Sequence, residues 1–462
     1  MKSIRVNLDF AKRFIAERVL HELLSYVHAN PDVNLPRLLN TVKRFVPEEK
    51  HRGQIARVLD VYENVPGIHA YVNRLFALHD NVKRRLVFNW FVNAQFLGVP
   101  RHRQIDETTG VHVPNFILID PTSACNLRCT GCWAGGYAKH DTLEFELVDR
   151  IVHEAKELGI YWIVMSGGEP FLWPHLIELA RRHSDTAFML YTNGTLIDDE
   201  MADKLLEVGN VSPAISLEGW RESTDARRGA GVFDRIMAAM DRMRTRGLAF
   251  GISLTLTRNN VEEATGNDFI DFLVEKGAMY GWSFHYIPVG RDPNPELMIT
   301  PAQRKYLTER IDEIRMRRGF PIADFWNDGE LTKGCIAGGR RYFHITAGGD
   351  VEPCAFVHVT THNIRNMSLK DVLQTPLFHA FQRRQPFSEN LLRACPIIDT
   401  PHKLREICAE TGARPSHPGA DSFLQSPLAD ELDARAERWG EVADVIWEER
   451  HPTREVVGSG VG

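Results

Sequence analysis

Short apolar runs alternate with helical patterns through the middle of the chain, between residues 114 and 318. The helical patterns include residues 143–158 and 233–246, where apolar side chains recur every three or four positions. Apolar strands separated by such helices are typical of a parallel sheet with helices on its outside. We therefore predict an α/β fold for this region. The runs predicted as strands are residues 115–120, 161–166, 187–192, 214–217, 250–257 and 282–288.

The first 110 residues have a helical pattern instead. Apolar residues recur at helical spacing between Phe10 and Val27, and residues 86–97 form another apolar-faced pattern. This part has 17 Lys and Arg against 11 Asp and Glu, whereas the whole chain has 55 against 61. The basic excess fits a surface for an anionic partner such as lipid headgroups, or a solvated helical face. Acidic residues lie between the basic ones, which makes nucleic acid an unfavourable candidate partner.

The overall composition is ordinary for a soluble protein, with 43% hydrophobic and 25% charged residues over 462 positions. The N-terminus has no signal-peptide pattern, and no stretch approaches the roughly 18 to 20 apolar residues of a membrane span. We therefore expect a cytoplasmic protein whose seven cysteines are reduced, as metal ligands or core thiols.

Three cysteines, Cys125, Cys129 and Cys132, form a C-x₃-C-x₂-C run. Three thiolates can bind three irons of a four-iron cluster and leave the fourth iron open to a substrate. A structural zinc site usually has four protein ligands, and this run contains no fourth Cys or His. The spacing therefore predicts an iron–sulfur site.

A second motif, SGGEP at residues 166–170, follows about 35 residues later, directly after a predicted strand. Its two glycines allow the backbone to approach a ligand closely, and its carboxylate or carbonyl groups can receive a positively charged amino group. Together with the cysteine run, this motif resembles the radical SAM (S-adenosylmethionine) superfamily. The six predicted strands match the partial (β/α)₆ TIM-type barrel that the resemblance implies.

The resemblance also implies an activity. A reduced [4Fe-4S] cluster would cleave SAM, and the resulting 5′-deoxyadenosyl radical would abstract hydrogen from a substrate. Reduced ferredoxin or flavodoxin would donate the electron.

By the same resemblance, residues near the ends of the predicted strands would bind SAM. The methionine amine would be held by Gly167, Gly168, Glu169 and Pro170. The turn after the third strand contains Asn193, the ribose and methionyl groups would meet Ser216 and Glu218, and the loop that lines adenine would contain Pro288.

Arg228, or its neighbour Arg227, resembles the residue that pairs with the SAM carboxylate. One departure concerns adenine. The position before the third cysteine is usually aromatic in this superfamily, but here it is Gly131. Trp133 is the alternative adenine contact.

The remaining four cysteines, Cys335, Cys354, Cys395 and Cys408, follow the barrel region. The C-x₁₃-G-x₄-C pattern from Cys335 to Cys354 predicts a β-hairpin that turns at residues 347–350. It resembles the opening half of the SPASM and twitch extensions, and this implies one auxiliary [4Fe-4S] cluster.

The sequence leaves the ligands of this auxiliary site open. Cys395 precedes a proline in an irregular stretch, which suits a ligand, whereas the spacing around Cys408 also suits the core face of a helix. If Cys408 is a core residue, the fourth iron is open or is bound by a histidine such as His358 or His402. A tetrahedral zinc site made by the four cysteines is the alternative metal centre.

These patterns predict a helical domain at residues 1–110, a barrel at 114–318, an auxiliary cluster domain at 330–411, and a linker with a helix at 412–462. The N-terminal helices would cap the barrel mouth or receive a partner. A lipid or other metabolite is the favoured substrate, and a peptide or protein is the alternative. A non-catalytic iron–sulfur carrier or scaffold is a third hypothesis, but it leaves the GGE motif, residues 167–169 of SGGEP, without a purpose.

Overall fold

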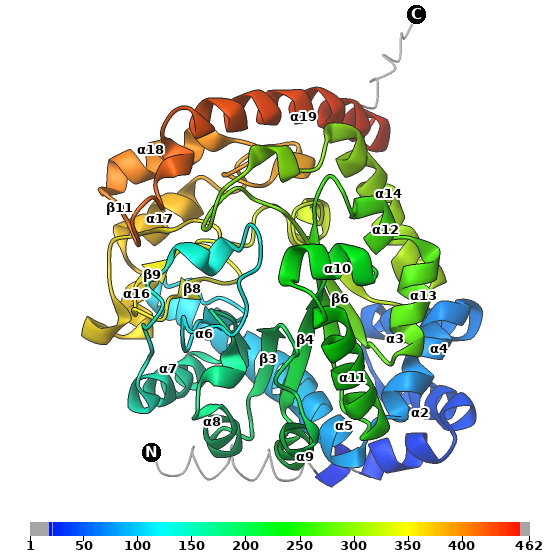
Figure 1. Ribbon diagram of the computed structural model, residues 1–462. Helices are drawn as coiled ribbons and strands as arrows, with labels where there is room; N and C mark the ends of the chain where they lie inside the picture. The colour runs from blue at the N-terminus through cyan, green and yellow to red at the C-terminus, as the bar shows by residue number, and fades with distance from the viewer. Residues whose placement is uncertain (1–17, 21, 453–462) are drawn as a thin grey trace, which may run out of the picture.

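The computed structural model describes residues 18–20 and 22–452 and is built around one sheet with helices outside it (Figure 1). Phe10 and the other apolar residues before Arg18 lie outside the described residues. The sheet has the order β7-β6-β5-β4-β3-β2-β1-β8-β9, and β1 to β7 pair in parallel. The strands are β1 (Ile117–Ile119), β2 (Trp162–Met165), β3 (Ala187–Thr192), β4 (Val211–Leu217), β5 (Gly251–Leu256), β6 (Tyr280–His285), β7 (Ile322–Asp324), β8 (His344–Ile345) and β9 (Val351–Glu352).

The predicted barrel fold is confirmed, because β1 to β6 coincide with the six apolar runs. β7 extends the parallel sheet beyond the predicted barrel region, and its three residues are too short for periodicity to reveal. The helices pack one apolar face on the sheet: α7, for example, buries Val148, Ile151 and Val152. The barrel helices are α7 (Phe145–Leu158), α8 (Leu176–Arg182), α9 (Asp199–Val208), α10 (Arg221–Arg228), α11 (Val232–Thr245), α12 (Val261–Ala264), α13 (Asn267–Glu275) and α14 (Pro301–Arg317).

The N-terminal helices cover the amino ends of the strands. The backbone N–H of His79 donates to the carbonyl of Gly247 at 2.9 Å, and Arg74 donates to the carbonyl of Gly319 at 2.7 Å. Both carbonyls lie in loops that lead into strands, and Figure 1 shows the blue N-terminal helices at the right and lower right, away from the red C-terminal helix at the top. The expectation that these helices cap the barrel mouth is therefore wrong. They are α2 (Pro31–Phe45), α3 (Glu49–Asn64), α4 (Pro66–Phe76), α5 (Asp80–Val87), the π-helical segment η1 (Phe88–Gly98) and α6 (Val99–Thr109).

The C-terminal part lies over the carboxyl ends of the strands (Figure 1). The predicted hairpin is confirmed: β8 pairs antiparallel with β9 and parallel with β1, so it continues the barrel sheet. The indole of Trp439 docks the last helix by donating to the carbonyl of Leu392 at 3.0 Å. The remaining elements are α15 (Gly329–Thr332), β10 (Val359–Thr360), α16 (Leu369–Val372), α17 (Pro376–Arg383), α18 (Pro401–Thr411), β11 (Arg414–Pro415), α19 (Leu428–Arg450) and the 3₁₀ turns η2 (Trp133–Gly136), η3 (Pro170–Leu172), η4 (Pro295–Leu297), η5 (Ile364–Asn366), η6 (Leu391–Arg393) and η7 (Ser422–Leu424).

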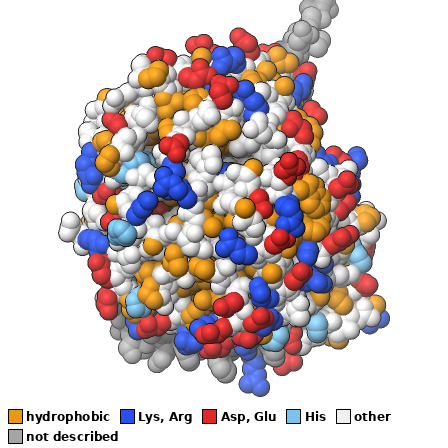
Figure 2. All heavy atoms as spheres, in the orientation of Figure 1, with side chains coloured by type: hydrophobic (Ala, Val, Ile, Leu, Met, Phe, Trp, Pro, Cys, Tyr) orange, Lys and Arg blue, Asp and Glu red, His pale blue; other side chains and the backbone are white. Residues whose placement is uncertain are grey.

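The expected lipid or other anionic partner would contact the surface of the N-terminal helices. No helix in the described ranges has both the length and the apolar character needed to cross a membrane. Figure 2 shows acidic and basic side chains interspersed over one face, without a broad basic patch there. Helix α2 buries none of its residues, and Phe45 at its end is 82% exposed. Contact of these helices with a lipid or another partner therefore stays a proposal.

Candidate active site

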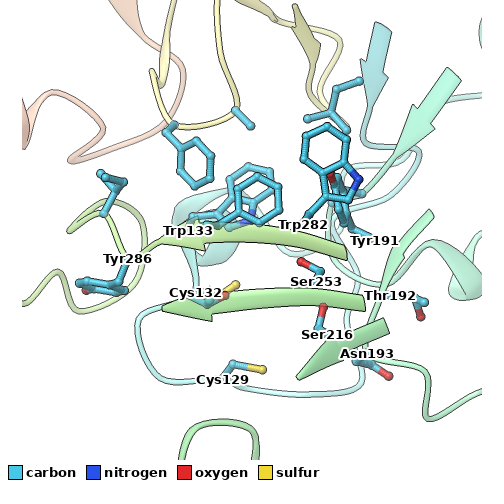
Figure 3. Close-up of a pocket in the computed structure, with 18 of the residues that line it drawn as sticks. Cys129, Cys132, Trp133, Tyr191, Thr192, Asn193, Ser216, Ser253, Trp282 and Tyr286 are labelled. Carbon is cyan, nitrogen blue, oxygen red and sulfur yellow. The ribbon is translucent and has the colours of Figure 1, made fainter. Parts of the chain in front are cut away.

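A chamber lies at the carboxyl ends of the barrel strands, next to the cysteine loop that follows β1. In Figure 3, Cys129 and Cys132 lie near Ser216, and the rings of Trp133 and Trp282 lie across from them. The structure therefore brings most of the predicted site residues together. Those that line the chamber are Cys125, Cys129, Cys132, Trp133, Gly167, Gly168, Asn193, Ser216, Arg227 and Arg228. Those that lie outside its lining are Glu169, Pro170, Glu218 and Pro288.

The two glycines of the GGE motif pack against the cysteine loop. A Cβ atom on Gly167, whose φ is +101°, would lie 2.4 Å from the carbonyl oxygen of Thr122. A Cβ atom on Gly168 would lie 2.0 Å from the carbonyl oxygen of Ala124. The N–H of Gly168 donates to the Thr122 carbonyl at 2.9 Å. Only glycine permits this close contact. The two glycines therefore hold the cysteine loop in place and also line the chamber.

The carboxylate of Glu169 binds the turn after β3 and does not line the chamber. It accepts hydrogen bonds from the Thr192 hydroxyl at 2.7 Å and the Asn193 N–H at 2.8 Å. The Asn193 amide in turn donates to Asn126 of the cysteine loop at 2.8 Å. Burial raises the pKa of Glu169. Its backbone N–H donates to the carbonyl of Ala124 at 2.8 Å, and its carbonyl accepts from Leu172 at 2.9 Å. Glu169 therefore holds neighbouring segments of the chamber in place.

Glu218 pairs with both candidate arginines. Its Oε1 accepts from Arg227 Nη1 at 2.6 Å and from Arg228 Nε at 2.8 Å. Its Oε2 is buried and has no hydrogen-bond partner among the described residues. Arg228 also extends Nη1 to 4.0 Å from the sulfur of Cys129. The site thus presents two guanidiniums beside the cysteines and one buried acceptor that lacks a donor.

Tyr286, directly after β6, fills the space that Gly131 leaves open. A Cβ atom on Gly131 would lie 2.6 Å from the Tyr286 ring, which lines the chamber. The ring of Trp133 packs with His344 and Phe356 instead, at centroid distances of 5.7 and 5.8 Å. Tyr286 was not among the residues predicted from the sequence. An aromatic residue at a strand end was the available signal, because the usual aromatic position holds glycine.

Two buried histidines were not predicted from the sequence either. His285, 2% exposed, lines the chamber with Nε2 3.5 Å from Asp324. His344 lies between Asp120, at 2.9 Å, and Glu352, at 2.7 Å, and joins the hairpin to β1. Burial alone would lower the pKa of His344, but the two carboxylates outweigh it and raise this pKa to about 10. Glu352 is the cross-strand partner of His344 in the hairpin, whereas Asp120 comes from the end of β1, so its contact with His344 leaves no local sequence signal.

A second cavity lies beneath the hairpin and is lined by Cys335, Cys354 and Cys395. Each sulfur accepts a backbone N–H from two residues further on, at 3.4 to 3.5 Å. Cys125 of the first loop accepts the same kind of bond, from Leu127 at 3.4 Å. Such bonds stabilise a thiolate. Burial raises the pKa of all three cavity thiols to about 12, so a cationic iron centre would be needed to hold them as thiolates.

Cys408 does not join this cavity. It is buried on α18, and it does not line the cavity of the other three cysteines. His358 and His402 do not line it either, and both ring nitrogens of His358 are taken, by the carbonyl of Ala355 and by His417. Within the described ranges, no three His, Cys, Asp or Glu side chains converge on a single metal ion. This geometry favours a cluster on three cysteines, with Cys408 in the core.

We expect Cys408→Ser to leave the iron and sulfide content of the reconstituted protein unchanged, because its sulfur faces the core. Cys395→Ser is the matched variant and should lose the iron of the auxiliary site. Elemental analysis and the absorption spectrum measure both. A loss of iron in Cys408→Ser as large as that in Cys395→Ser would identify Cys408 as a ligand.

Comparisons with known proteins agree with this geometry. Residues 119–268 match the family model of the radical SAM superfamily, and residues 335–396 match that of an iron–sulfur cluster-binding domain, SPASM. The AdoMet-dependent heme synthase of Methanosarcina barkeri is 26% identical over 68% of this chain and 96% of its own. The mycofactocin maturase MftC of Mycobacterium ulcerans is 30% identical over 54% of this chain and 70% of its own. The fold is similar to that of Streptococcus suis SuiB bound to the precursor peptide SuiA, with a TM-score of 0.54 and 19% identity over 64% of this chain and 74% of SuiB.

Proposed function

This chain belongs to the radical SAM superfamily and carries a SPASM domain, and we propose that it abstracts hydrogen from a largely apolar metabolite. Enzymes of this superfamily bind SAM at a [4Fe-4S] cluster, and SPASM domains bind auxiliary iron–sulfur clusters. Cys125, Cys129 and Cys132 would hold the first cluster here. The three cysteines of the second cavity would hold one auxiliary cluster, whose fourth iron has no cysteine ligand.

The residues around the cysteine loop suit SAM. Glu218 lies outside the chamber lining and holds the guanidiniums of Arg227 and Arg228 beside the cysteines. Arg228 can share its guanidinium between Glu218 and the carboxylate of the methionyl group. Ser216 and Asn193 line the chamber close by, and the Tyr286 ring offers a surface for adenine.

When bound and reduced, the first cluster supplies the electron that cleaves SAM to the radical that takes hydrogen from the substrate. We propose reduced ferredoxin or flavodoxin as its electron donor. The chain's own residues orient SAM and the substrate and keep water out of the chamber.

The aromatic wall of the chamber is the observation that carries the substrate proposal. Trp282 and Phe284 of β6 stack at a centroid distance of 6.0 Å with 10° between their planes, and Tyr191 meets Phe284 edge-on at 5.5 Å. Among the described lining residues, only the two arginines paired with Glu218 carry a permanent charge. Such a wall favours an apolar, planar group.

Relatives suggest two substrate classes. The heme synthase match covers 68% of this chain, and another relative, 32% identical over 44% of this chain, is an Fe-coproporphyrin III synthase. A tetrapyrrole, whose ring is planar and apolar, is therefore the first metabolite to test. The maturase and the peptide-bound SuiB make a peptide the alternative. The N-terminal region favours the metabolite, because its described part, up to residue 110, is helical and contains no strand that could pair with a peptide.

The test uses full-length protein, reconstituted anaerobically and supplied with SAM and dithionite. Fe-coproporphyrin III, a phospholipid dispersion, or synthetic peptides from short reading frames beside its gene are added separately. We expect Fe-coproporphyrin III or the lipid to raise 5′-deoxyadenosine formation several-fold over SAM alone, with a new product in the mass spectrum. Stimulation by a peptide alone would contradict the metabolite proposal and support the maturase alternative.

A further inference from the structure

Tyr342 reaches from the chamber to the auxiliary cysteines. Its side chain is 1% exposed, and its ring lines the chamber, stacked on Phe116 at 5.1 Å with 9° between the planes. Its hydroxyl lies 2.9 Å from the sulfur of Cys354. One residue therefore touches both the space for the substrate and a ligand of the second cluster.

The direction of this hydrogen bond follows from its surroundings. The N–H of Ala355 approaches the Tyr342 oxygen at 3.4 Å, so that oxygen already accepts one bond and can point its proton at the sulfur. A tyrosine phenol ordinarily keeps its proton at neutral pH and can donate it. A cysteine that binds iron has lost its own proton and can only accept.

Cys354 thereby differs from the other two cysteines of the cavity. Among the described residues, Cys335 and Cys395 accept only backbone N–H groups, from Ala337 and Ile397. Cys354 accepts the N–H of Phe356 at 3.5 Å and the Tyr342 hydroxyl as well. The strongest donor at the auxiliary site thus comes from the chamber wall.

We infer that Tyr342 tunes the auxiliary cluster, raising its reduction potential by donating a hydrogen bond to the Cys354 thiolate. Reduction adds negative charge that spreads onto the sulfur ligands, and a hydrogen bond to sulfur stabilises that charge. A higher reduction potential makes the auxiliary cluster a better acceptor for an electron that comes from a substrate in the chamber. The inference rests on the proposed cluster of Cys335, Cys354 and Cys395.

The test isolates the auxiliary cluster by replacing Cys125, Cys129 and Cys132 with alanine, so that one cluster remains. Its midpoint potential is measured by an EPR-monitored redox titration, with and without Tyr342→Phe. We expect this substitution to lower the equilibrium constant for reduction about tenfold, which is about 59 mV for a one-electron couple. Tyr191→Phe is the control, because Tyr191 lines the chamber and makes no hydrogen bond to a cysteine among the described residues; it should leave the potential unchanged.

A second variant is needed in case Tyr342→Phe binds too little iron for its potential to be measured. 3-Fluorotyrosine in place of Tyr342 has nearly the same size and is a stronger donor, so it should raise the potential. Equal potentials with tyrosine, phenylalanine and fluorotyrosine at equal iron content would overturn the inference about Tyr342, but not the auxiliary cluster itself. A triple-alanine protein with Tyr342 intact that incorporates no iron would overturn the auxiliary cluster itself, and the inference with it.

Discussion

Replacement of Cys125, Cys129 and Cys132 together by alanine should abolish reductant-dependent formation of 5′-deoxyadenosine from SAM. The three side chains line one chamber, beside Gly168 and Arg228, and no other cysteine of the described chain lines it. Without their thiolates, the chamber has nothing to hold the cluster that delivers the electron. Chromatography of the anaerobic reaction mixture measures the product, and iron analysis should show that the auxiliary iron is retained.

The control for this loss is Cys408→Ser, which removes a buried thiol that lies outside the chamber. It should retain the SAM cleavage of the unchanged protein. Cleavage at an undiminished rate in the triple variant would mean that the electron enters elsewhere, and the assignment of the first cluster would be wrong.

Among glycine-to-alanine substitutions in the chamber lining, Gly168→Ala should reduce the stability of the protein most. The new Cβ would lie 2.0 Å from the carbonyl oxygen of Ala124, the residue directly before Cys125. The obstructing atom is backbone, so the cysteine loop itself must move. We expect a loss of stability of about 3 kcal/mol, typical of the upper range for an overpacked site, together with loss of the first cluster and of SAM cleavage. Thermal unfolding and iron analysis measure the two effects.

Gly53→Ala is the matched control, because a Cβ there meets nothing within 4 Å. Gly53 lies within helix α3, so alanine should stabilise the protein slightly. We expect Gly53→Ala to keep the iron content and the SAM cleavage of the unchanged protein, whereas Gly168→Ala should lose both. Normal cluster loading in Gly168→Ala would contradict the close packing of the motif on the loop.

Local patterns predicted the elements of the barrel well. A buried parallel strand is apolar along its whole length and an amphipathic helix is apolar on one face, so β1 to β6, α7 and α11 could be located from short stretches of sequence. The same patterns placed the cysteine run and the GGE motif at strand ends. Since parallel strands end at one edge of the sheet, these motifs had to lie near one another.

Side-chain direction could not be predicted in this way. Glu169 belongs to the motif that predicts a SAM contact, yet its carboxylate binds the turn at Thr192 and Asn193. Tyr286, directly after β6 and more than 150 residues further along the chain, fills the position left by Gly131. Which ring fills a gap depends on the packing of distant segments, and spacing within one segment carries no information about it.

The sequence by itself therefore determined the α/β class and the order of the strands along the chain, and it predicted the three thiols that line the chamber, because each follows from periodicity or spacing within a short segment. Only the tertiary structure decided the rest. It placed the N-terminal helices at the amino ends of the strands, left Cys408 outside the auxiliary cavity and brought Tyr342 onto Cys354. These results depend on which surfaces meet once the elements pack, and long-range packing is settled by shape and burial over the whole chain.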